Sequence, residues 1–197
     1  MFFVLAVSCF FEQALDDRNL AWLGAVAPLF AYLCIAISIG MSPWFGWDRN
    51  ALSDLGHSTR SSVAAIYNFG LSATGLLTIL FAATAARRHA KWTSLSLVFT
   101  GFSLQLVGMF DEVYGRLHGQ VSVLFFVSLG LSCLVYAIEK KSYLGLAGFI
   151  ISTAGWILYW MNVYHAGVAV PEMIAALVVL PMLVSMSLEI YRGKGVT

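Results

Sequence analysis

Six long apolar stretches constrain the fold of this chain more than any other feature of its sequence. Each has about the 20 residues that a helix needs to cross a bilayer, and short polar segments separate them. They run over approximately Leu20–Met41, Val63–Ala86, Trp92–Phe110, Gly119–Ile138, Tyr143–Met161 and Val168–Tyr191. The sequence therefore predicts an all-α, polytopic membrane bundle of six transmembrane helices, built from three helical hairpins.

The composition supports this class of protein. Charged residues make up 11% of the chain and hydrophobic residues 60%, whereas a soluble domain carries about 25% charged residues. These few charges are too sparse to cover the surface of a soluble protein. The formal net charge is only +1, so we expect no nucleic-acid partner.

The polar segments leave no room for a separate soluble domain. We divide the chain into an N-terminal segment of residues 1–19, a six-helix transmembrane domain of residues 20–191 and a tail of residues 192–197. The apolar run Met1–Phe11 is too short to span a bilayer, and no basic residues precede it as they would in a signal peptide. We expect the N-terminal segment to lie in the cytoplasm or at the membrane interface.

The distribution of lysine and arginine predicts the orientation. Eight of the eleven basic residues fall on the side of the two termini, and Arg49, Arg60 and Arg116 fall on the other side. Short cytoplasmic loops of membrane proteins are enriched in these residues. We therefore expect a multi-pass protein of the cell membrane with both termini in the cytoplasm.

One face of the fifth apolar stretch is made of small residues. Gly145, Gly148, Ser152 and Gly155 follow one another at spacings of three and four residues, which places them on the same side of a helix. Small side chains let a neighbouring backbone approach closely in a membrane. This pattern predicts a helix-packing face and indicates no ligand site.

Each of the three outer hairpin tips contains an acidic residue and a histidine. The pairs are Asp54 with His57, Asp111 and Glu112 with His118, and His165 with Glu172. Such side chains can exchange protons or mark an ion pathway. The first outer loop, residues 42–62, is also longer than the 2–8 residues that usually connect two helices. We therefore expect any chemistry at the outer face.

Two motifs near this face resemble a known family. Asn50-Ala51-Leu52-Ser53-Asp54-Leu55-Gly56 follows the first apolar stretch, and Val107-Gly108-Met109-Phe110-Asp111-Glu112 precedes His118-Gly119. Both are similar to motifs of a prokaryotic membrane-protein family catalogued as domain of unknown function 998. The resemblance covers the six-helix layout and implies that Ser53, Asp54, Glu112 and His118 are the stronger candidates for site residues. Asp111 is a weaker candidate, because the family commonly has proline at that position. The activity of that family is not established, so the resemblance implies no reaction.

These residues form a candidate site. The candidate catalytic residues are Asp54, Glu112 and His118, and the candidate binding residues are Asn50, Ser53, Asn68 and Glu172. In this hypothesis His118 or Glu112 is the base and Asp54 orients it. Asn68, within the second apolar stretch, is expected to bond to Asp54 or Glu112.

Structural readings of the same residues stay open. Ser53 and Asp54 are residue types that accept hydrogen bonds from backbone amides at turns, and Glu172 complements the positive end of a helix dipole. Zinc is a further hypothesis, because imidazole and carboxylate groups bind this ion. No HxxxH or HExxH spacing supports it, so the metal ligands remain unassigned.

Three functions remain in competition. The first is an outward-facing polar pocket that binds or modifies a lipid headgroup, for which a looser likeness to eukaryotic glycolipid-remodelling membrane proteins also argues. The second is a small transporter or a component of an ion or proton pathway. The third is a structural or sensory membrane subunit without chemistry. Whether the chain is an enzyme is undecided at this level.

Overall fold

The computed structural model describes residues 17–193, which contain helices and no strand. The elements are α2 (Asp17–Ala21), α3 (Leu23–Gly40), η1 (Leu52–Gly56), α4 (Ala64–Phe81), η2 (Ala82–Ala86), α5 (Arg87–His89), α6 (Lys91–Met109), η3 (Glu112–Tyr114), α7 (Arg116–Lys140), α8 (Tyr143–Trp160) and α9 (Ala169–Tyr191). The N-terminal segment predicted over residues 1–19 lies mostly outside the described residues, as does most of the tail.

Six helical spans in the described part of the chain are long and apolar enough to cross a membrane. The first joins α2 and α3, the second joins α4, η2 and α5, and the other four are α6, α7, α8 and α9. Each begins and ends within three residues of the stretch predicted from the sequence. The predicted class, a multi-pass all-α bundle of six transmembrane helices, is confirmed.

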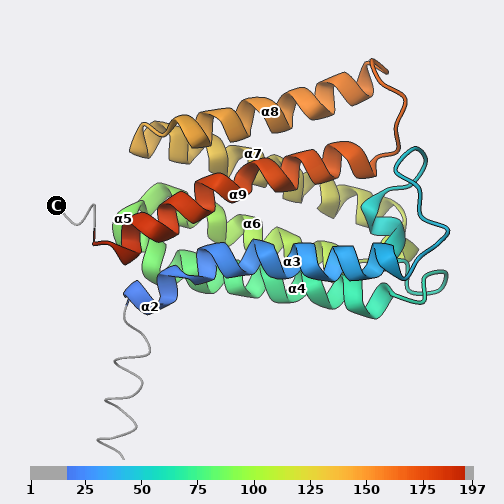
Figure 1. Ribbon diagram of the computed structural model, residues 1–197, viewed down its shortest axis with the longest axis horizontal. Coiled ribbons are helices and arrows are strands. Elements are labelled where there is room, and N and C mark those ends of the chain that lie inside the picture. Colours follow the sequence, from blue (N-terminus) through green and yellow to red (C-terminus); the bar gives the residue numbers. More distant parts are fainter. Residues whose placement is uncertain (1–16, 194–197) are drawn as a thin grey trace, which may run out of the picture.

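The six spans run side by side along the long axis of the molecule (Figure 1). Because six is an even number, α2 and the end of α9 lie at the same end of the bundle, which we call the terminal end. The opposite end holds η1, η3 and the connection between α8 and α9, and we call it the loop end. All the candidate site residues belong to the loop end.

The small-residue face predicted for the fifth span is confirmed. Gly145, Gly148, Ser152 and Gly155 are the buried residues of α8. A Cβ atom added at Gly145 would lie 2.8 Å from the backbone oxygen of Cys133 in α7, closer than two such atoms can approach. Glycine is therefore required for α7 and α8 to lie this close together.

The long first loop folds back onto the start of α9. The amide of Gly167 donates to the Trp47 carbonyl over 2.8 Å, and the amide of Ala169 donates to the Asn50 carbonyl over 2.9 Å. Leu55, in η1, is fully buried, and η1 lies between the loop ends of α3 and α9 (Figure 1). These contacts hold the first candidate motif against the last helix.

Candidate functional site

Five of the predicted site residues gather at the loop end, and we call them the acidic cluster: Ser53, Asp54, Glu112, His118 and Glu172. They come from four elements, η1, η3, α7 and α9. Four of the five, Ser53, Glu112, His118 and Glu172, line a common groove. Asp54 joins them because its carboxyl group lies beside that of Glu112. Residues that are far apart in the sequence thus form one polar site.

Asp54 shapes the loop and also contacts the cluster. Its Oδ2 atom accepts hydrogen bonds from the Asn50 side-chain amide over 2.7 Å and from the Ala51 backbone amide over 3.0 Å. Asn50 Oδ1 in turn accepts a bond from the Gly46 amide over 2.9 Å. Asn50 and Asp54 therefore close the turn that leads into η1, which agrees with the structural reading of Asp54.

The Glu112 carboxyl group accepts fewer hydrogen bonds than that of Asp54. Its Oε1 atom accepts one long hydrogen bond from the Ser53 hydroxyl, over 3.5 Å. Burial and, to a smaller extent, the adjacent Asp54 carboxyl together raise the pKa of the Glu112 carboxyl to about 7, against smaller opposing effects of Ser53 and Arg60. Two carboxyl groups in contact cannot both ionise at low cost. The Glu112 carboxyl group can therefore exchange its proton near neutral pH.

Glu172 lies deepest in the cluster and is only 6% exposed. Its Oε2 atom accepts a 2.7 Å hydrogen bond from the backbone amide of Leu52, 120 residues earlier in the chain. The side chain lines the groove and also an internal cavity of about 110 Å³. Glu172 thus fixes η1 to α9 and stands between two cavities, beyond the helix-start role considered from the sequence.

His118, in the first turn of α7, is held at both ring nitrogens. Nδ1 lies 2.7 Å from the Phe110 carbonyl oxygen, and Nε2 lies 3.2 Å from the Ser122 hydroxyl. Ser122 was not among the residues predicted from the sequence. Its position four residues after His118 is the signal that identifies it, because such residues are neighbours on a helix.

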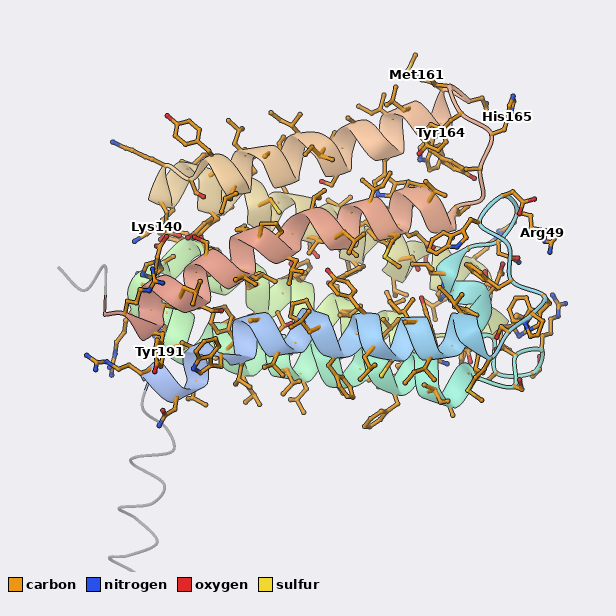
Figure 2. All side chains as sticks on the ribbon, viewed as in Figure 1. Arg49, Lys140, Met161, Tyr164, His165 and Tyr191 are labelled. Atoms are coloured by element: carbon orange, nitrogen blue, oxygen red, sulfur yellow. The ribbon has the colours of Figure 1, made fainter. Side chains whose placement is uncertain are left out.

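The acid–histidine pairs noted in the sequence do not form contacts. His57 lies 3.3 Å from the Thr59 hydroxyl, and His165 is exposed and projects from the connection between α8 and α9 (Figure 2). Asp111 is buried and accepts bonds from the backbone amides of Ser58 and Val113, which ties two loops together. The acidic residues converge with one another instead.

The prediction that Asn68 bonds to Asp54 or Glu112 is wrong. Its side-chain amide donates a 2.8 Å hydrogen bond to the Gly56 carbonyl oxygen, and not to Asp54 or Glu112. The reason is that η1 ends at Gly56, beside this turn of α4, so the Gly56 carbonyl oxygen is within hydrogen-bonding distance of the Asn68 amide. Asn68 thus holds the end of η1 against α4 and does not line the groove.

The groove has a volume of about 610 Å³ and runs from the acidic cluster along α7 and α8. Beyond the cluster its walls are mostly apolar side chains: Val123, Phe126, Val127, Leu131, Phe149, Trp156, Ile157 and Trp160. Several of these also face outward from the bundle, as Val123 does at 60% exposed and Trp160 at 71%. In a membrane-spanning bundle such a face contacts lipid. The carboxyl and imidazole groups of the groove thus lie at the loop end, and apolar side chains line it from Trp160, at that end, to Leu131 and Phe149 in the middle of the bundle.

Trp156 adds an unmatched donor to the groove. Its indole Nε1 is buried, and no hydrogen-bond partner for it exists among the described residues. A buried donor without a partner costs about 1–3 kcal/mol. An acceptor on a molecule in the groove would remove this cost. The sequence did not identify Trp156 as a groove residue, because a tryptophan near the end of an apolar stretch is typical of the membrane interface.

The zinc hypothesis gains no ligand set from the structure. Within residues 17–193, no group of three or more His, Cys, Asp and Glu side chains is placed to hold a metal ion. The two described cysteines, Cys34 and Cys133, are buried in the bundle.

Comparison with known proteins extends this description. The model of the family described as "Protein of unknown function (DUF998)" matches residues 25–189, which include most of the six-span bundle and the whole acidic cluster. No curated protein and no solved structure matches the chain. The family match confirms the resemblance drawn from the two motifs. The chain belongs to the DUF998 family.

Proposed function

We propose that this protein binds a membrane lipid at the loop end. The headgroup lies against the acidic cluster, and an acyl chain lies along the apolar part of the groove. One observation carries the proposal: a single groove holds carboxyl and imidazole groups at the loop end only, and most of its remaining wall is apolar side chains. A lipid has the same order of polar and apolar parts.

The bias in basic residues supports an orientation for this site. Lys140 and Tyr191 lie at the terminal end of the bundle (Figure 2), on the side that holds eight of the eleven basic residues of the sequence. By the rule that cytoplasmic loops are rich in lysine and arginine, we place the terminal end in the cytoplasm of a cell-membrane protein. The groove then opens at the outer leaflet.

This orientation can be tested at Asn162, an exposed residue in the connection between α8 and α9. In intact cells, an Asn162→Cys variant should react with a membrane-impermeant maleimide as fast as it does after the cells are opened. The wild-type chain is the control for its own cysteines. A variant that reacts only in opened cells would reverse the assigned orientation.

Lipid binding can be tested by filling the groove. Gly130 lines it, and a Cβ atom added there would meet its nearest neighbours, in Phe149 and Ser152, only at 3.9 Å. Gly130→Leu therefore occupies the groove without distorting the helices. Native mass spectrometry should show a lipid bound to the wild-type protein and at least a tenfold weaker lipid signal for Gly130→Leu.

Gly40→Leu is the matched control. Gly40 is exposed in α3, no atom lies within 4 Å of its added Cβ, and it is remote from the groove. This variant should keep the lipid. Equal lipid signals in Gly130→Leu and the wild-type protein would contradict the proposal.

An ion or proton pathway is the second candidate function, and one observation favours it. The internal cavity shares Ser53, Ser122, Phe126 and Glu172 with the groove and also contains the hydroxyl-bearing residues Tyr67, Thr74 and Thr100. A buried carboxylate between two cavities is a common element of proton pathways. Proteoliposomes that carry this function should show a pH-dependent flux above that of empty vesicles, and a Glu172→Gln variant should abolish it.

A further inference from the structure

The bonds of His118 define which of its nitrogens is free to accept a proton. Nδ1 lies 2.7 Å from the Phe110 carbonyl oxygen, and a carbonyl can only accept a hydrogen bond. In the neutral ring, Nδ1 therefore carries the hydrogen and Nε2 carries the lone pair. The Ser122 hydroxyl, 3.2 Å from Nε2, is then the donor of that bond.

Ser122 differs in this from most other serines in the bundle. Six serines within helices donate their hydroxyl to a backbone carbonyl three or four residues earlier: Ser38, Ser96, Ser103, Ser128, Ser152 and Ser187. That bond is the ordinary choice of a serine in a helix. Ser122 contacts an imidazole nitrogen instead, and this is the arrangement that activates a serine as a nucleophile.

The position of Ser122 makes its hydroxyl accessible to a molecule in the groove. The side chain is half-buried and lines both the groove and the internal cavity. It lies six residues after the start of α7 at Arg116, which is about 9 Å along a helix that rises 1.5 Å per residue. The ester carbonyls of a lipid lie at a similar depth, just below its headgroup.

The charges near Ser122 favour an uncharged electrophile. Glu112 and Glu172 line the same end of the groove, and Asp54 lies against Glu112. A carboxyl group repels a phosphate anion whenever it is ionised, so attack on the phosphorus of a charged phosphate is disfavoured here. A carboxylic ester has no charge at its reacting carbon.

We propose that Ser122 and His118 are the nucleophile and the base of an acyl-transfer reaction on a lipid ester. This inference rests on the proposed lipid-binding function, and it names the substrate class as a carboxylic ester near the headgroup. Ser122 is the catalytic residue that attacks the ester, and His118 is the catalytic base. The Phe110 carbonyl keeps the imidazole in the reactive tautomer, as a third group does in other nucleophile–base pairs.

The reaction proceeds in two balanced steps. Ser122 Oγ forms a bond to the carbonyl carbon, its proton passes to His118 Nε2, and the bond from that carbon to the alcohol oxygen breaks as His118 returns the proton to the leaving alcohol. A water molecule or a second alcohol then attacks the acyl-serine, gives its proton to His118, and releases the acyl group while Ser122 recovers its proton. No redox partner is required.

The test uses the full chain in detergent and a lipid-like fluorophosphonate, which forms a covalent bond with activated serines. Mass spectrometry of the intact protein should show one adduct, and peptide mapping should place it on Ser122. Ser152 lines the same groove but donates to the Phe149 carbonyl, so its peptide is an internal reference that should remain unmodified. Ser122→Ala should abolish the adduct, and Ser128→Ala, on the same helix but outside the groove, should not.

His118 is tested by rate. His118→Ala should slow adduct formation at least about 100-fold, the usual contribution of a general base. Ser122→Cys covers the case in which Ser122→Ala does not fold: its thiol should react with iodoacetamide faster than that of a Ser122→Cys/His118→Ala variant. An absent adduct, an adduct on Ser152, or equal rates with and without His118 would overturn the inference. If lipid still copurifies in those cases, the proposed lipid binding stands without the acyl transfer.

Discussion

The two ends of the bundle each present a glutamate near the start of a helix, and the two glutamates are bonded very differently. At the terminal end, Glu139 accepts bonds from the backbone amides of Trp92 and Thr93, over 3.0 and 2.8 Å, and from the Thr93 hydroxyl over 2.7 Å. At the loop end, Glu112 has one long bond to Ser53 and a neighbouring carboxyl group.

This difference distinguishes a carboxylate whose oxygens are occupied by a helix end from one that has acceptor capacity to spare. Glu139 satisfies the first amides of α6, which have no partner within their own helix, and its acceptor oxygens are occupied. Glu112 faces a groove with acceptor capacity in reserve and a proton that it can exchange near neutral pH. The bond partners of a carboxylate therefore tell more about its role than its position at a helix end does.

The largest expected effect is on stability, at Glu139. Glu139→Ala leaves two amides at the start of α6 without an acceptor, and we expect a loss of about 2 kcal/mol in the free energy of unfolding. Denaturant unfolding in detergent measures this loss, and lipid binding should persist in the folded fraction. A stable Glu139→Ala variant that has lost its lipid would reverse the roles assigned to the two glutamates.

The next effect is on lipid binding, at Glu112. Glu112→Gln keeps the shape of the side chain but removes the exchangeable proton, and we expect lipid affinity to fall about tenfold, which corresponds to roughly 1.4 kcal/mol. The free energy of unfolding should stay the same or rise, because a carboxyl group beside Asp54 is lost. Native mass spectrometry and denaturant unfolding of one preparation give both values. Loss of stability with unchanged lipid binding is the result that contradicts this assignment.

A separate effect concerns the pH dependence of stability. The pKa of Glu112 is raised from 4.5 to about 7 by burial and by Asp54, so between these values the folded protein binds more protons than the unfolded chain. The contribution of Glu112 to the free energy of unfolding therefore falls as pH rises through this window and levels off above pH 7. Glu112→Gln should remove this fall, and Asp54→Asn should move it to lower pH. Identical pH profiles for all three proteins would show that the Asp54–Glu112 contact is absent.

The smallest effect is expected at His165. This residue is exposed and lies outside the groove, so His165→Ala should change stability by less than about 0.5 kcal/mol and leave lipid binding unaltered. The same two measurements test it. A lipid-binding defect in this variant would extend the acidic cluster to the connection between α8 and α9.

The spans and their packing were predictable because both depend on local sequence. A run of apolar residues long enough to cross a bilayer defines each helix, and the spacing of Gly145, Gly148 and Gly155 defines which side of α8 is buried. The motifs around Asp54 and Glu112 lie at one end of the bundle, as their positions between the spans predict.

The contacts within the site were not predictable in the same way. The bond from Leu52 to Glu172 joins residues 120 positions apart, and the partner of Asn68 is a backbone oxygen whose place depends on the path of the loop. Pairing each acid with the nearest histidine in sequence failed because the turns at Asp54 and Asp111 direct those carboxylates toward backbone amides. Tertiary packing decides such bonds.

The attachment of η1 to α9 has a consequence for how the protein is made. The amides of Gly167 and Ala169 and the side chain of Glu172 hold the first loop against α9, and they are synthesised after the first five spans. The first two helices and the loop between them are thus made well before the residues of α9 that this loop contacts. A chain truncated before residue 167 therefore keeps most residues of the groove but lacks Glu172 and the contacts that hold the first loop against α9.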